Sequence, residues 1–436
     1  MRSRALVTGV FAVSWMVAMA APVSARSVPP TGPQTLTIGV DWADAANQNP
    51  FAGRVFEYTD FFSRTVRIHS GDTLDFHTAP GAFHIVSLAK SEQVARMVYP
   101  VALADADHDG ADIATGSGVD KVIFGPSNFP ITGGSTHGGG SIAFNNGFGP
   151  PVCGVAALGQ QPCTFAGGDD IEVIGPTPGF DATGNPAFVD QLVHVTATPG
   201  EYDYFCFIHP GMRGKLQVVD AQDGTTTQAD INRRSMEQFE RDRAAGLDLE
   251  ADANRVTFSG EQPGSRTYNV HVGVGNPESH VAIDEMLPTQ QLNLMPGDRV
   301  RYLWADPHNV HSVAFPAFPF PATNPSLPEP FGFDCGPNAP FYIGIPNVPG
   351  APPPRVCVEP GDSQPEGIGD PGNAAPGTRL TSPAQVVDAG VRVGTAYGVH
   401  PSSQAWSVTT DDQTTAGTYR FKCQVHDWMQ GVLKVG

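Results

Sequence analysis

The chain has 436 residues, enough for two or three domains that each bury a core of their own. Its formal charge of −19 excludes nucleic acids and anionic membrane surfaces as partners held by bulk electrostatics. Glycine (49) and proline (41) are frequent between short runs rich in valine, threonine and phenylalanine, a texture that favours an all-β protein over a helical one.

The N-terminus has the layout of a secretory signal peptide. Arg2 and Arg4 precede an apolar run, and the small residues Val23-Ser24-Ala25 form a cleavage site after Ala25. We therefore expect residues 1–25 to be removed and the mature protein to be secreted or periplasmic. No later stretch approaches the length of a membrane span.

Two stretches far apart in the chain resemble each other. Each begins with a strand, a Gly-Asp turn and a second strand, at 66–76 in the first and 292–302 in the second. Each ends with a strand, a short loop and a final strand, at 199–219 and 416–435. This internal repeat predicts two domains of the same fold.

The segment between the repeats has a different character. Residues 228–250 are rich in Arg, Glu, Asp and Ala and lack proline, which predicts a helix. Its partial apolar face consists of Ile231, Met236, Phe239 and Ala244. The predicted organisation is a first domain at 34–220, a helical linker at 221–254 and a second domain at 255–436. A Gly- and Pro-rich insertion interrupts each domain, roughly at 90–185 and 316–400.

The six cysteines are of two kinds. Cys153 and Cys163 lie close together in the first insertion, and Cys335 and Cys357 lie in the second. Local disulfides 153–163 and 335–357 fit an oxidising compartment, although the other two pairings of these four remain open. The other two cysteines stand in a shared motif.

That motif is Cys-x-x-His-x-x-Met. It consists of Cys206, His209 and Met212 in the first repeat, and Cys423, His426 and Met429 in the second. A type-1 copper site uses one thiolate, two imidazoles and a weak axial thioether, and such a loop supplies three of these four ligands. Zinc is the main rival metal, but a single thiolate with a methionine does not suit a structural zinc site.

Each loop needs a second histidine from upstream. In the first domain His84 is the candidate, and the alternative His77 follows the Gly71-Asp72 turn too soon. In the second domain His308 and His311 compete.

These motifs resemble the cupredoxin family of blue copper proteins. The run from Tyr202 to Lys215 is similar to the ligand loop of amicyanins and, more loosely, of plastocyanins, and 307–311 (Pro-His-Asn-Val-His) resembles their first-histidine segment. The resemblance covers the core strands of both repeats and excludes the insertions and the helix. It implies two Greek-key β-sandwiches in tandem with two type-1 coppers. It also selects His308, because His311 then aligns with Ser87.

The neighbours of the two ligand cysteines bear on function. Multicopper oxidases and copper nitrite reductases place a histidine beside this cysteine, whereas the neighbours here are Phe205 and Phe207 in one repeat, Lys422 and Gln424 in the other. We therefore expect a one-electron carrier with a soluble redox partner. The alternatives are an extracytoplasmic copper-binding or buffering protein, and a copper oxidoreductase with an unrecognised second copper site.

A separate pattern lies in the first insertion. Asp105, Asp107 and Asp109 begin a D-x-D-x-D-G run like the start of a calcium loop. The twelfth position is Gly116 where an EF-hand has glutamate. This segment is therefore expected to be either a solvated acidic turn or, as the alternative, a calcium site.

Overall fold

The computed structural model describes residues 32–43, 56–94, 136–137, 140–144, 153–155, 157, 159–169, 171–178, 187–207, 209–276, 278, 280–317, 376–385, 387–394, 405–423, 426 and 429–436. The chain divides into two units, 1–32 and 33–436, and every described helix and strand belongs to the second. The predicted signal peptide, the calcium pattern at 105–109, Cys335 and Cys357 lie outside the described residues. Among the helices that the structure describes, none is long and apolar enough to cross a membrane.

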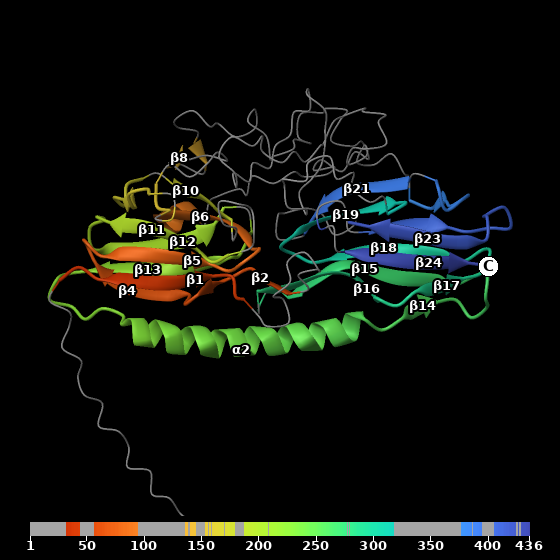
Figure 1. Cartoon of the computed structure of the whole chain (residues 1–436), viewed down its shortest axis with the longest axis horizontal. Helices are drawn as coiled ribbons and strands as arrows, with labels where there is room; N and C mark the ends of the chain where they lie inside the picture. The colour runs from red at the N-terminus through yellow and green to blue at the C-terminus, as the bar shows by residue number, and fades with distance from the viewer. Residues whose placement is uncertain are drawn as a thin grey trace, which may run out of the picture. The chain divides into compact units, whose positions relative to one another are not determined.

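The first repeat forms a sandwich of two sheets (Figure 1). One sheet has the order β3 (Phe61–Phe62), β1 (Thr35–Val40), β5 (Thr73–Thr78), β11 (Val189–Val195) and β9 (Cys163–Phe165). The other has the order β4 (Thr65–His69), β13 (Arg213–Val219), β12 (Gly200–Cys206), β6 (Phe83–Lys90), β10 (Ile171–Pro178), β8 (Gly140–Phe144) and β7 (Thr136–His137). A short helix, α1 (Ser91–Val94), follows β6. Alternate residues such as Ile38, Phe76 and Leu216 turn inward and form one core between the sheets.

The second repeat forms a sandwich of the same kind. Its first sheet has the order β2 (Phe56–Tyr58), β16 (Val281–Leu287), β15 (Thr267–Asn276), β18 (Arg299–Ala305), β22 (Ala405–Thr409) and β20 (Thr378–Arg379), with β14 (Thr257–Ser259) paired to β15. Its second sheet has the order β17 (Leu292–Leu294), β24 (Gln430–Val435), β23 (Gly417–Lys422), β19 (Val310–Phe315) and β21 (Val387–Val393).

The two sandwiches share one topology. The order β17-β24-β23-β19-β21 repeats the order β4-β13-β12-β6-β10, and the first strand of each row pairs in parallel with the second. In the opposite sheets the pair β15–β18 repeats the parallel pair β1–β5. The prediction of an all-β fold built from two repeats is therefore confirmed.

Strand β2 crosses between the repeats. It lies in the sequence of the first repeat, yet Tyr58 pairs with Val281 in the sheet of the second sandwich. A hydrophobic cluster surrounds this crossing and combines Phe56 and Phe62 with Ile283. The two sandwiches thus share a strand pairing and a piece of core, which the sequence repeat did not indicate.

The predicted helix is present as α2 (Gln228–Ala253), which packs against strands of both sandwiches (Figure 1). Thr227 caps it, because its side chain accepts a hydrogen bond from the Asp230 N–H at 3.1 Å. The buried stripe differs from the predicted apolar face, since Met236 is exposed and Gln238 is buried. The Gln238 amide donates to Asp60 Oδ2 at 2.6 Å, so a polar contact attaches the helix to the sheet.

Candidate metal centres

Neighbouring strands bring the first group of predicted ligands together. His84 is the second residue of β6, Cys206 is the last residue of β12, and the pairing of these strands sets Cys206 opposite Val86. His209 and Met212 lie in the loop that follows. This loop is held by backbone hydrogen bonds from Cys206 N to Met212 O at 2.9 Å and from Met212 N to His209 O at 3.2 Å.

The donor atoms of this first group converge. His84 Nδ1 lies 3.0 Å from His209 Nδ1, which lies 3.4 Å from Cys206 Sγ. The Ile85 N–H donates to the same sulfur at 3.4 Å. Met212, from the same loop, is fully buried. The group His84, Cys206 and His209 offers one metal-binding atom per residue, all within 4.8 Å of one another.

The second group repeats this geometry with His311, Cys423 and His426. His311 Nδ1 lies 3.0 Å from His426 Nδ1, and Cys423 Sγ lies 3.9 Å from the latter nitrogen. The Ser312 N–H donates to the sulfur at 3.3 Å. Met429 is buried, and its carbonyl accepts from Cys423 N at 2.9 Å, as Met212 does in the first group.

The geometry brings His311, and not the expected His308, beside Cys423 and His426. His311 is the second residue of β19, as His84 is of β6, and each precedes the residue whose N–H reaches the cysteine sulfur. His308 lies in the turn before β19. Its Nδ1–H donates instead to the carbonyl of Pro210, at 2.6 Å, in the ligand loop of the first group.

A spacing in the sequence pointed to the same residue. His84 follows Asp72 of its Gly-Asp turn by 12 positions, and His311 follows the corresponding Asp298 by 13, whereas His308 follows it by 10. The Pro-His-Asn-Val match located the segment but not the residue at which the strand begins. Strand register decides which histidine faces the cysteine.

The alternative His77 is not part of the first group. It lies at the surface on β5 and pairs with Asp190 on β11. The predicted disulfide Cys153–Cys163 is present, and Cys206 and Cys423 are both buried outside it.

A buried carboxylate orients each upstream histidine. His84 Nε2 lies 3.3 Å from Asp41 Oδ2, and His311 Nε2 lies 3.2 Å from Asp306 Oδ2. Because a carboxylate only accepts, each Nε2 carries a proton, and Nδ1 is the nitrogen that faces the neighbouring imidazole and thiol. Two such sets of converging N and S donors fit a soft metal such as copper.

Charge at the second group favours the thiolate form of Cys423. Burial alone raises the pKa of this thiol, but hydrogen bonds with His311 and His426 outweigh burial and hold the pKa well below its usual value. Burial likewise lowers the pKa of His311, but Asp306 and Cys423 outweigh it and raise the pKa to about 10. A thiolate is the form of cysteine that binds metals.

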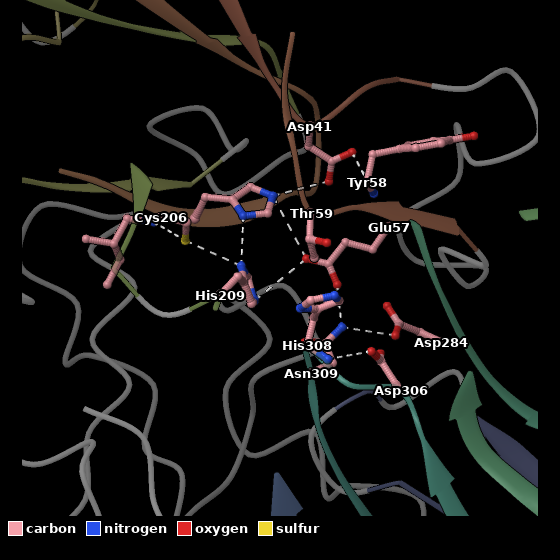
Figure 2. Close-up of polar contacts among 12 residues, drawn as sticks. Asp41, Glu57, Tyr58, Thr59, Cys206, His209, Asp284, Asp306, His308 and Asn309 are labelled. Carbon is pink, nitrogen blue, oxygen red and sulfur yellow. Dashed lines mark hydrogen bonds and ion pairs between the residues drawn. The ribbon is translucent and has the colours of Figure 1, made fainter. Parts of the chain in front are cut away.

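Four buried carboxylates around the two groups were not found from the sequence. Asp41 and Glu57 lie beside the first group, and Asp284 and Asp306 lie beside the second. Figure 2 shows all four side chains. They come from separate elements with no shared motif. Aspartate and glutamate are mostly exposed in proteins, so no single-sequence pattern marks these four as buried.

Comparisons with known proteins give the following similarities. No protein-family model matches the chain, and no curated protein matches it. Among solved structures, auracyanin B is 14% identical, with 44% of this chain and 94% of that chain covered and a TM-score of 0.20. A Cu-containing nitrite reductase from Thermus scotoductus SA-01 is 10% identical (93% and 68% covered, TM-score 0.16), and a blue copper oxidase from Nitrosomonas europaea is 9% identical (92% and 86% covered, TM-score 0.16). The two-sandwich architecture therefore rests on the chain's own strand order, and the candidate metal centres rest on its two His-Cys-His groups.

Proposed function

We propose that this chain is a copper protein with two mononuclear type-1 centres and that it carries single electrons. His84, Cys206, His209 and Met212 would hold the first copper, and His311, Cys423, His426 and Met429 the second. The observation that carries the proposal is the duplicated group in which two imidazole Nδ1 atoms, 3.0 Å apart, adjoin a buried cysteine sulfur. Copper bound there supplies a one-electron couple.

The protein's contribution is a rigid and dry ligand set. In each group three side chains come from the end of one strand and the loop after it, which is closed by backbone hydrogen bonds, and the fourth sits on an adjacent strand. Such a frame holds the ligands in one arrangement in both oxidation states. Four protein donors complete a type-1 site, which favours electron transfer over turnover of a substrate.

The ligand assignment is tested by substitution and copper counting. Wild-type protein should bind two coppers and show the visible absorption and electron-spin-resonance signature of thiolate-bound copper(II). Cys206→Ser and Cys423→Ser should each remove one copper and part of the colour. The double variant Cys153→Ser/Cys163→Ser is the control, since it removes two disulfide-bonded sulfurs that belong to neither group. If neither single substitution changes the spectrum of the copper-loaded protein, the proposal is wrong.

A second pair of variants separates the two candidate histidines. His311→Ala should abolish the second centre, and His308→Ala should leave both coppers bound. Copper loss from His308→Ala alone would restore the motif-based assignment.

The carrier role is tested by stoichiometry. Each centre should accept and return one electron without consuming oxygen or nitrite. Catalytic consumption of either would replace the carrier by an oxidoreductase, and readily reversible copper release would favour buffering.

We also infer export, because the Cys153–Cys163 disulfide fits an oxidising compartment. N-terminal sequencing of the mature protein should begin at Arg26, and an intact N-terminus would contradict export by cleavage.

A further inference from the structure

We propose that the two centres exchange electrons within one molecule through a hydrogen-bonded bridge formed by Glu57, Asn309 and Asp284. This inference rests on the proposed function, because it requires copper at both groups.

The bridge begins at a carboxylate that faces both imidazoles of the first group. Glu57 Oε1 lies 3.9 Å from His84 Nε2 and 3.9 Å from His209 Nε2. Glu57 belongs to β2, the strand that leaves the first repeat and pairs with β16 of the second sandwich. The strand crossing therefore carries a contact of the first group into the neighbouring sandwich (Figure 2).

One side-chain amide then joins carboxylates on both sides. Asn309 Nδ2 donates to Glu57 Oε2 at 2.6 Å and to Asp284 Oδ1 at 3.2 Å. Asp284 Oδ1 in turn lies 3.8 Å from Nε2 of His311 in the second group. Four contacts, of 3.9, 2.6, 3.2 and 3.8 Å, thus lead from an imidazole of one group to an imidazole of the other.

The bridge is buried along its length. Glu57 is 8%, Asn309 5% and Asp284 1% exposed. Fixed hydrogen bonds that exclude water keep the donor and acceptor groups in one geometry, so the coupling along this path does not depend on mobile solvent.

The first group is less exposed to an outside partner than the second, which favours an internal route. His209 is only 7% exposed, and the other three side chains of its group are fully buried. The His308 ring contacts the ligand loop at Pro210, and a Cβ placed on Gly211 would lie 3.3 Å from it. His426 of the second group is less buried. Electrons that enter at the second centre can then reach the first through the bridge.

The transfer is balanced without another reactant. With copper held by both groups, the electron lost by copper(I) at one centre would be the electron gained by copper(II) at the other. The bridge groups keep their protons and no bond forms or breaks. A purely structural role, in which the same residues only hold the sandwiches together, would affect stability and leave the transfer rate unchanged.

The test uses the full copper-loaded chain, reduced with less than one equivalent of electrons by a pulse of a small radical reductant. Cys206→Ser and Cys423→Ser provide the spectrum of each centre alone. In wild-type protein a bimolecular phase should be followed by a first-order phase, independent of protein concentration, in which one centre is reoxidised as the other is reduced. Absence of this phase with both centres loaded would overturn the exchange. Failure to bind two coppers would instead overturn the proposed function.

Substitution of the central amide tests the route. Asn309→Ala should abolish the first-order phase while the copper content stays the same. Reduction potentials measured on the same variant distinguish loss of the route from a change in driving force. Asn254→Ala is the control. Asn254 Oδ1 accepts a hydrogen bond from Thr289 N at 2.8 Å, at a position away from both groups, so this variant should leave the phase unchanged. An unchanged rate in Asn309→Ala would overturn the bridge. If that variant does not fold, Glu57→Ala breaks the same route one step earlier and must also abolish the phase.

Discussion

The carboxylate beside each upstream histidine should set the reduction potential of its centre. Asp306 Oδ2 lies 3.2 Å from His311 Nε2, and both residues are buried. Its negative charge stabilises the more positive, oxidised state of whatever metal His311 binds. Asp306→Asn removes that charge at nearly constant volume, and the potential of the second centre should therefore rise.

The size of the effect follows from Coulomb's law. One unit charge at roughly 5–10 Å from another contributes about 2–3 kcal/mol at an effective dielectric constant of about 20. For a one-electron couple, with about 59 mV for each tenfold change, this corresponds to an increase of about 90–130 mV. Water entering the site would screen the charge and place the shift toward the low end of this range.

Direct electrochemistry of copper-loaded protein measures the shift, both with the two centres present and in a Cys206→Ser background in which only the second centre responds. Asp41→Asn is the matched variant, because Asp41 Oδ2 lies 3.3 Å from His84 Nε2. This substitution should raise the potential of the first centre alone. A potential that does not move in Asp306→Asn, or that falls, would refute the electrostatic argument. Equal shifts at both centres in one variant would refute its local character.

Three further predictions concern stability. Gly211 has φ 89° and faces His308 closely, so Gly211→Ala should destabilise the first ligand loop by about 1–2 kcal/mol and weaken the colour of that centre, as seen in thermal unfolding with visible spectroscopy. Burial raises the pKa of Asp60 from 3.8 to about 6 despite its Arg64 partner, so its stabilising contribution is complete below pH 3.8 and is lost as the pH rises through 6. In urea unfolding of wild-type protein, the free energy of unfolding should fall by about 3 kcal/mol at most over this pH range, and Asp60→Asn should remove the decrease. If the free energy depends on pH in the same way in Asp60→Asn, Asp60 is not the source. Loss of the Cys153–Cys163 disulfide, which closes a separation of 10 residues, should cost about 2–3 kcal/mol in denaturant unfolding and leave copper content unchanged.

Local patterns were sufficient for the repeat, the strands and the two ligand loops. Cysteine, histidine and methionine occupy one short loop, so their spacing alone brings them together. The upstream histidine lies on another strand, and its identity depends on the residue at which β19 begins. A four-residue match to a known family selected His308, while the antiparallel register placed His311 beside Cys423.

The carboxylate cluster could not be predicted for a different reason. Asp41 follows β1, Glu57 lies in β2, Asp284 lies in β16 and Asp306 follows β18, and only the tertiary fold brings these positions together. In sequence each reads as a surface acid of a strongly acidic protein. The pairing of β2 with β16 turns Glu57 from an expected surface residue into a contact of both imidazoles in the first group.

The two groups share one electrostatic feature, which bears on how electrons would distribute between them. Each upstream histidine faces two buried carboxylates, Asp41 and Glu57 at the first centre, Asp306 and Asp284 at the second. The two copper centres that we propose should therefore have similar potentials, and an electron exchanging between them would occupy both. Asp306→Asn would remove one charge from the second centre only and so raise its potential. With about 59 mV for each tenfold change, the ratio of half-reduced molecules with the electron on the second centre to those with it on the first should increase more than tenfold. The same substitution thus tests the potential of one centre and the exchange between the two.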